Sequence, residues 1–168
     1  MVGAMKLIET AIDDKGESYI CAQSEPKGKE FTGHILTDLF FANNIPPDIL
    51  VSSAEHAAEN FNLAPGEIRF LRSDVYPSKR VYDTISDKEN KPPFKKLFYH
   101  STTTLDFVVV LRGKLILIVG DQEIPIEAGD CIIQRGAAHA WHNYTDEVAT
   151  LIAVMIGIAP PAQFKLIP

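Results

Sequence analysis

The second half of the chain contains a series of short apolar segments separated by turn residues, with no helical periodicity between them. Leu105–Leu111 and Lys114–Val119 are joined by Arg112-Gly113. Gly120-Asp121 then leads into Gln122–Ile126, the Gly-first spacing of a tight hairpin. The series continues with Asp130–Gln134, Ala138–Asn143 and Ala149–Ile156. Because strands follow one another with turns and no crossover helix, this pattern predicts an all-β fold, either an antiparallel barrel or a sandwich.

The first half adds further candidate strands. Lys6–Ile12 and Ser18–Gln23 should pair as a hairpin, since the intervening turn contains a glycine that can adopt positive φ. Two more strands are predicted at His34–Phe41 and Glu67–Val75. The remaining expected elements are a short helix at Ser52–Asn60 and a long polar loop at Ser86–Pro93.

The chain has 168 residues, of which 46% are hydrophobic, which is enough for one sizeable core. We therefore expect a single domain over 1–168, with a barrel core at about 67–156 and an N-terminal β extension at 6–66. The early strands exceed what a minimal barrel needs. An exposed strand edge is readily covered by a symmetry mate, so a homodimer is expected.

Charge and cysteine content limit the partners. The net charge is -6 and the chain has no dense Lys/Arg cluster, which argues against nucleic acid or an anionic membrane surface as a partner. No apolar segment approaches the length of a membrane span. Two cysteines, Cys21 and Cys131, form neither a disulfide framework nor a thiolate metal site. These features predict a cytoplasmic protein whose partner is a small molecule, with Cys131 packed as a small apolar residue.

Side-chain alternation identifies candidate cavity residues. If the chain is extended from Tyr99 onward, one face carries polar residues and then valines. The polar residues of that face are His100, Thr102, Thr104 and Asp106. On a later segment His139 and Trp141 share a face, with His142 on the opposite one, where it is expected to point outward. Two imidazoles and one carboxylate are donors suited to Fe, Zn, Mn, Ni or Cu.

These segments resemble the two signature motifs of the cupin superfamily, G-x5-H-x-H-x3-4-E-x6-G and G-x5-P-x-G-x2-H-x3-N. In the first motif His100 occupies the first histidine position, Asp106 replaces the glutamate and Gly113 follows at the expected spacing. In the second, the G-x2-H-x3-N spacing is kept by Gly136, His139 and Asn143. The resemblance covers about Glu67 to Ile156 and implies a small, conserved-barrel type of cupin, an antiparallel jelly-roll-like β-barrel with extra N-terminal strands.

The sequence departs from these motifs in ways that bear on the metal. Thr102 stands at the second histidine position, and the stretch before Gly136 is one residue short and lacks the proline. The resemblance therefore implies at most a three-ligand centre of His100, Asp106 and His139. The other residues expected to face the cavity are Thr102, Thr104 and Trp141.

Two functions from different classes remain open at this point. In the first, one divalent metal on His100, Asp106 and His139 serves an enzyme of the dioxygenase, decarboxylase or isomerase type that acts on a small organic substrate. In the second, the protein is a metal-free, non-catalytic module that binds or senses a small ligand. In a metal-free cavity, His100, Asp106 and His139 would either hydrogen-bond a polar ligand or act as general acid and base. A barrel fold does not choose between them.

Overall fold

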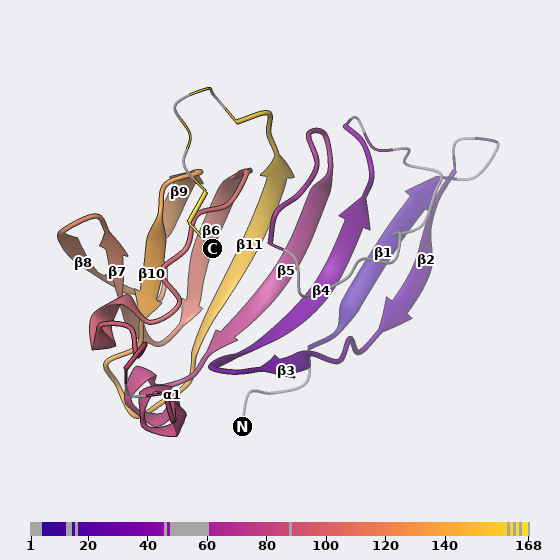
Figure 1. Cartoon of the computed structure of the whole chain (residues 1–168). Coiled ribbons are helices and arrows are strands. Elements are labelled where there is room, and N and C mark those ends of the chain that lie inside the picture. The colour runs from indigo at the N-terminus through magenta and orange to yellow at the C-terminus, as the bar shows by residue number, and fades with distance from the viewer. Residues whose placement is uncertain are drawn as a thin grey trace.

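A computed structural model of the chain describes residues 5–12, 15, 17–45, 47, 61–87, 89–160, 162, 164, 166 and 167. Its strands are grouped into three sheets, and every strand pair is antiparallel (Figure 1). The strands of the first half are β1 (Leu7–Ile12), β2 (Ser18–Ser24), β3 (Lys29–Phe31), β4 (His34–Ala42) and β5 (Ile68–Val75). Those of the second half are β6 (Thr104–Arg112), β7 (Lys114–Val119), β8 (Gln122–Glu127), β9 (Cys131–Arg135), β10 (His139–His142) and β11 (Ala149–Gly157).

The body of the protein consists of two sheets. The larger has the strand order β3-β4-β5-β11-β6-β9 and the smaller the order β10-β7-β8. The buried core takes side chains from both, among them Leu71, Val110 and Leu151 from the large sheet and Leu115 and Leu117 from the small one. Strands from both halves of the chain thus share one sheet, and the predicted all-β antiparallel fold is confirmed.

The apolar run of β6 is buried on one face only. Val108 and Val110 lie in the core, whereas Phe107, Val109 and Leu111 are exposed. The run is apolar throughout its sequence, yet only one of its faces is buried, because successive side chains of a strand point to opposite faces. The predicted strands agree with the observed ones to within a few residues.

Gly113 shows why the β6–β7 turn needs a glycine. Its φ is +86°, and a Cβ placed there would lie 2.9 Å from the Cα of Ala149. A side chain at this position would therefore be strained twice, by the backbone conformation and by the close approach of β11.

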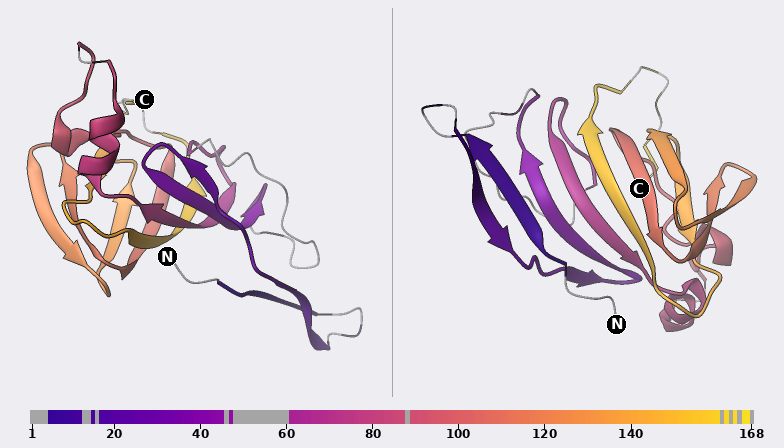
Figure 2. Two further views of the ribbon diagram at one scale, coloured as in Figure 1. Left: turned by 90° about the horizontal axis from the view of Figure 1, so that it is seen from below. Right: turned by 180° about the vertical axis from the view of Figure 1, so that it is seen from behind.

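The N-terminal hairpin is separate from the two body sheets. β1 and β2 pair with each other and, within the described residues, with no other strand. Figure 2 shows this hairpin projecting away from the body. Ile8, Tyr19 and Ile20 are all more than half exposed. The N-terminal extension thus divides into strands that join the large sheet and a hairpin that does not.

Two helical segments were not predicted: α1 (Ser78–Thr84) and the short 3-10 helix η1 (Phe94–Lys96). Phe94 of η1 lies 4.9 Å from His142, ring centroid to centroid, and His142 is buried. The expectation that His142 points into solvent was therefore wrong: it does lie opposite His139, but η1 covers that face. The predicted helix at Ser52–Asn60 lies outside the described residues.

Cys131 is exposed, contrary to prediction, because it lies on the outer face of β9, the edge strand of the large sheet. Neither helix of the described residues is long and apolar enough to cross a bilayer.

Candidate active site

A cavity of about 400 Å³ opens into the body of the protein. Its apolar lining comes largely from the inward faces of β5, β6 and β11, including Leu71, Val108, Leu151 and Met155. Its polar lining includes His100, Thr102, Asp106 and His139, all of which were predicted as site residues, and Trp141 lines it as predicted. The structure thus gathers five of the six predicted residues around one cavity.

His100 and His139 are held together by the backbone. Each peptide N–H donates to the other residue's carbonyl, at 3.0 Å from His100 and 2.8 Å from His139. The two ring centroids are 4.7 Å apart. This bridge joins the segment before β6 to β10, so residues distant in the sequence present paired imidazoles to the cavity.

Hydrogen bonds to backbone carbonyls set the orientation of both rings. His100 Nδ1 lies 2.7 Å from the carbonyl oxygen of Phe98, and His139 Nδ1 lies 2.9 Å from that of Ala137. A carbonyl oxygen only accepts, so Nδ1 carries the proton in each ring and donates it. In a neutral imidazole the remaining nitrogen, Nε2, is then a hydrogen-bond acceptor.

Burial favours the neutral form of His139. Its side chain is almost fully buried, and desolvation, followed by the proximity of His100, lowers its pKa to about 4. The ring is therefore neutral at physiological pH, with its Nε2 lone pair free to accept a proton or a hydrogen bond.

Asp106 is a carboxyl group with little access to water. Burial raises its pKa to about 6, opposed by a hydrogen bond from the Thr104 hydroxyl. Its Oδ1 has no hydrogen-bond partner among the residues that the structure describes. Within the same described part of the chain, the Nε2 of Gln134, the residue directly opposite on β9, is likewise buried without a partner. Near neutral pH this carboxyl can both give and take a proton.

Thr102 and Thr104 occupy different depths. Thr102 lines the cavity, whereas Thr104 is completely buried and its Oγ1 lies 2.7 Å from Thr102 Oγ1, within hydrogen-bonding distance. Thr104 is absent from the cavity lining, so its predicted place there needs correction: it lies behind the wall. Thr104 begins β6 and lies between Thr102 and Asp106 on the same face, which explains why it contacts both of them.

Sequence reasoning missed an aromatic part of the wall. His34, Phe61 and Phe98 all line the cavity. The His34 ring centroid is 6.1 Å from that of each phenylalanine, and Phe61 lies 5.7 Å from His100. Burial and then His100 lower the pKa of His34. One sequence feature could have indicated His34: on the predicted strand His34–Phe41 it lies on the same face as the apolar Leu36.

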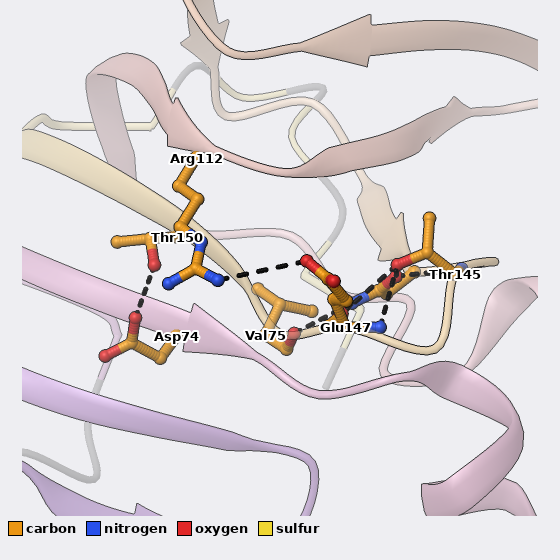
Figure 3. A network of polar contacts seen from close by, with 7 residues as sticks. Asp74, Val75, Arg112, Thr145, Glu147 and Thr150 are labelled. Carbon is orange, nitrogen blue, oxygen red and sulfur yellow. Dashed lines mark hydrogen bonds and ion pairs between the residues drawn. The ribbon is translucent and has the colours of Figure 1, made fainter. Parts of the chain in front are cut away.

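Asn143, the last residue of the second motif, has a structural part. Its side-chain amide donates to the carbonyls of Val75 and Glu147, at 3.0 and 2.7 Å, and its oxygen accepts from Thr145. Figure 3 shows Arg112 facing Glu147 of the same loop and, beside it, Thr150 of β11 donating a hydrogen bond to Asp74 of β5. This network fixes the connection that follows β10 and hence the strand that carries His139.

Comparison with known proteins now identifies the domain. The family described as "Cupin domain" matches residues 92–155, the segment that carries both imidazoles and Asp106. The chain contains a cupin domain. The solved cupin domain of Schizosaccharomyces pombe Cnp3 superposes with a TM-score of 0.50 at 9% identity, covering 90% of this chain and 87% of that one, which supports the fold alone.

Two fungal proteins share a local sequence similarity with the chain. "Oryzines biosynthesis cluster protein J" of Aspergillus oryzae is 44% identical over 46 residues, covering 27% of this chain and 26% of that protein. "Cupin-domain-containing oxidoreductase virC" of Hypocrea virens is 44% identical over 48 residues, covering 27% of this chain and 24% of that protein. The match thus spans only about a quarter of either relative.

The donors of the cupin domain do not fit the expected three-ligand metal centre. No group of three or more His, Cys, Asp or Glu side chains in the described part of the chain is arranged to hold one metal ion. The structure brings His100 and His139 together, but Asp106 does not join them in a coordinating cluster. Thr102, in place of a second motif histidine, adds only a weak ligand.

Proposed function

We propose that this cupin domain binds a small, mostly apolar organic molecule in its cavity and moves a proton on it. The pairing of His100 and His139 at the cavity wall, with both Nδ1 atoms engaged by carbonyls, carries the proposal. This arrangement leaves two Nε2 atoms available to a ligand. A buried, neutral imidazole and a carboxyl of raised pKa that line the same cavity are suited to general acid and base catalysis.

Among the reaction types implied by the family resemblance, the geometry favours the isomerase type. An imidazole Nε2 would remove a proton from the bound molecule, and Asp106, when protonated, would return one at another position. Each step exchanges only a proton, so substrate and product have the same composition. Oxidation or decarboxylation in a cupin would call on a metal, and the described donors do not form its centre.

Elemental analysis tests the metal-free part of this proposal. The protein is purified without chelator and without a histidine tag, and its metal content is measured. We expect well below one transition-metal ion per chain. Near-stoichiometric metal that is lost on His139→Ala substitution would overturn this expectation and favour the metal-dependent enzyme.

Binding itself is tested through Trp141, the sole tryptophan of the chain, which lines the cavity. Its ring lies 5.3 Å from that of His139, so a molecule bound beside the imidazoles should change its fluorescence. Titration with 4-tert-butylphenol, a compact apolar probe, should give a saturable change. If neither fluorescence nor calorimetry detects binding, the proposed function is wrong.

We also propose a homodimer in which the β1–β2 hairpin of each copy packs on the outer sheet face of the other. An isolated two-stranded hairpin is only marginally stable in water, yet this one exposes Ile8, Tyr19 and Ile20. The outer face of β6 and β9 exposes a patch of its own, formed by Phe107, Val109, Leu111 and Ile133. Reciprocal exchange of the hairpins about a two-fold axis would cover both surfaces.

Light scattering coupled to size-exclusion chromatography tests the dimer. The wild-type chain should be a dimer at micromolar concentration, and Ile20→Lys or Phe107→Lys should each give monomers. A wild-type monomer would contradict the dimer. Dissociation by Phe107→Lys but not by Ile20→Lys would instead show that the patch packs against its own copy.

We infer a cytoplasmic location. Cys21 and Cys131 are both exposed and unpaired, and free, exposed thiols persist best in a reducing compartment.

A further inference from the structure

The charges around the cavity restrict the chemical class of its ligand, an inference that rests on the proposed function. Among the residues that the structure describes, no lysine or arginine lines the cavity. The ionisable groups of this described lining are Asp106 and the imidazoles of His34, His100 and His139. An anionic ligand would have to give up its hydration without gaining a lysine or arginine from these lining residues, which is costly in a buried site.

The hydrogen-bonding groups of the wall point to the same class. Because Nδ1 of His100 and of His139 donates to a backbone carbonyl, each ring in its neutral form offers only an acceptor, Nε2, to the cavity. The unpartnered Oδ1 of buried Asp106 is a further acceptor when ionised. A ligand that donates a hydrogen bond would satisfy these atoms, whereas one that only accepts would leave them unpaired.

The rest of the wall is apolar and in part aromatic. Phe61, Phe98 and Trp141 contribute rings, and Leu151 and Met155 contribute aliphatic surface. A volume of about 400 Å³ lies at the small end of the range for organic-ligand sites. The wall therefore fits one ring or a compact branched body.

We propose that the cavity selects an uncharged alcohol, phenol or enol with a compact apolar body, whose hydroxyl donates to Nε2 of His139 or His100, and that it rejects carboxylates and phosphates. A hydroxyl on an enolisable or aromatic body is also a group from which a base can remove a proton. A hydroxyl-bearing ligand of this class is therefore compatible with the proposed proton transfer, but its binding does not depend on that transfer.

Three probes of similar shape test this selectivity: 4-tert-butylphenol, tert-butylbenzene and 4-tert-butylbenzoate. The phenol is neutral at pH 7, the hydrocarbon lacks the donor, and the benzoate is an anion. Affinities are measured by Trp141 fluorescence and by calorimetry. The phenol should bind about tenfold more tightly than the hydrocarbon, since one net hydrogen bond separates them, and the benzoate should bind more weakly than either.

Matched variants separate the hydrogen bond from shape. His139→Phe and His100→Phe each keep a ring but remove one Nε2, and whichever of them removes the acceptor of the hydroxyl should abolish the preference for the phenol over the hydrocarbon. The same change at His142, three residues along β10 and on the face covered by Phe94, should leave that preference intact. A further variant, Asp106→Asn, removes the buried carboxylate and should narrow the gap between benzoate and phenol.

The outcomes distinguish the inference from the function on which it rests. Equal binding of phenol and hydrocarbon, or tightest binding of the benzoate, overturns the ligand class while leaving a small-molecule cavity. Binding of none of the three overturns both. A preference for the phenol that survives in His139→Phe and His100→Phe removes the imidazoles from the recognition and overturns the assignment.

Discussion

Replacement of Asp106 by asparagine should stabilise the protein at neutral and alkaline pH but not in acid. The carboxyl is 5% exposed, and burial raises its pKa from 3.8 to about 6. A folded-state pKa above the unfolded value means that the folded protein binds the proton more tightly. The stability that the folded protein gains from this tighter proton binding is complete below about pH 4 and is lost as the pH rises through 6.

The size of the effect follows from the difference between the two pKa values. At 1.36 kcal/mol per pKa unit, the rise from 3.8 to about 6 corresponds to about 3 kcal/mol between acid and alkaline conditions. Asparagine is neutral throughout and should not show this loss. The free energy of unfolding of Asp106→Asn relative to wild type should therefore increase by up to about 3 kcal/mol between pH 4 and pH 8.

Urea denaturation of both proteins at several pH values measures this difference directly, and comparison with wild type cancels the other titrating groups. Asp121→Asn is the control, because Asp121 is fully exposed and the difference should stay near zero. If the stability difference for Asp106→Asn does not change with pH, or changes in the opposite direction, the described burial of this carboxyl is wrong.

Three further predictions concern the supports of the site. Gly113→Ala should lower the free energy of unfolding by about 2 kcal/mol, because the added Cβ clashes with β11 and the φ of this residue is strained for alanine. The control Gly120→Ala, where no atom of the described residues lies within 4 Å of the added Cβ, should lower it by about 1 kcal/mol or less. Equal losses of stability for the two variants in thermal denaturation would refute the clash. Thr104→Val should raise the pKa of Asp106 further by removing its hydrogen bond, as followed by carboxyl NMR titration; an unchanged or lower pKa would show that the bond is absent. Asn143→Ala should lower the free energy of unfolding, measured by urea denaturation, by about 3 kcal/mol, because several buried hydrogen bonds are lost. A decrease of less than about 1 kcal/mol would mean that other contacts hold the loop.

Strand alternation predicted much of the fold and part of the site, because it depends only on neighbours in the sequence. It placed Thr102, Asp106 and Val108 on one inward face, and motif spacing identified His139 as a further cavity residue. The bridge between His100 and His139 could be anticipated only through the family resemblance, since nothing in the spacing alone pairs these two segments.

The errors share a cause: alternation states which face a side chain occupies but not what covers that face. His142 is buried because η1 lies over it, and Cys131 is exposed because it lies on the outer face of β9 together with exposed Ile133. His34 and Phe61 join the cavity from remote parts of the chain. Their positions depend on tertiary packing, for which the sequence carried no local motif.

A crystal structure of the protein soaked with 4-tert-butylphenol, with anomalous data collected to detect transition metals, tests the central claim most directly. We expect the phenol ring to lie against the apolar wall of the cavity, with its hydroxyl within hydrogen-bonding distance of Nε2 of His139 or His100. A transition metal bound between those two imidazoles, or a cavity that stays free of phenol while the probe binds elsewhere, would contradict it.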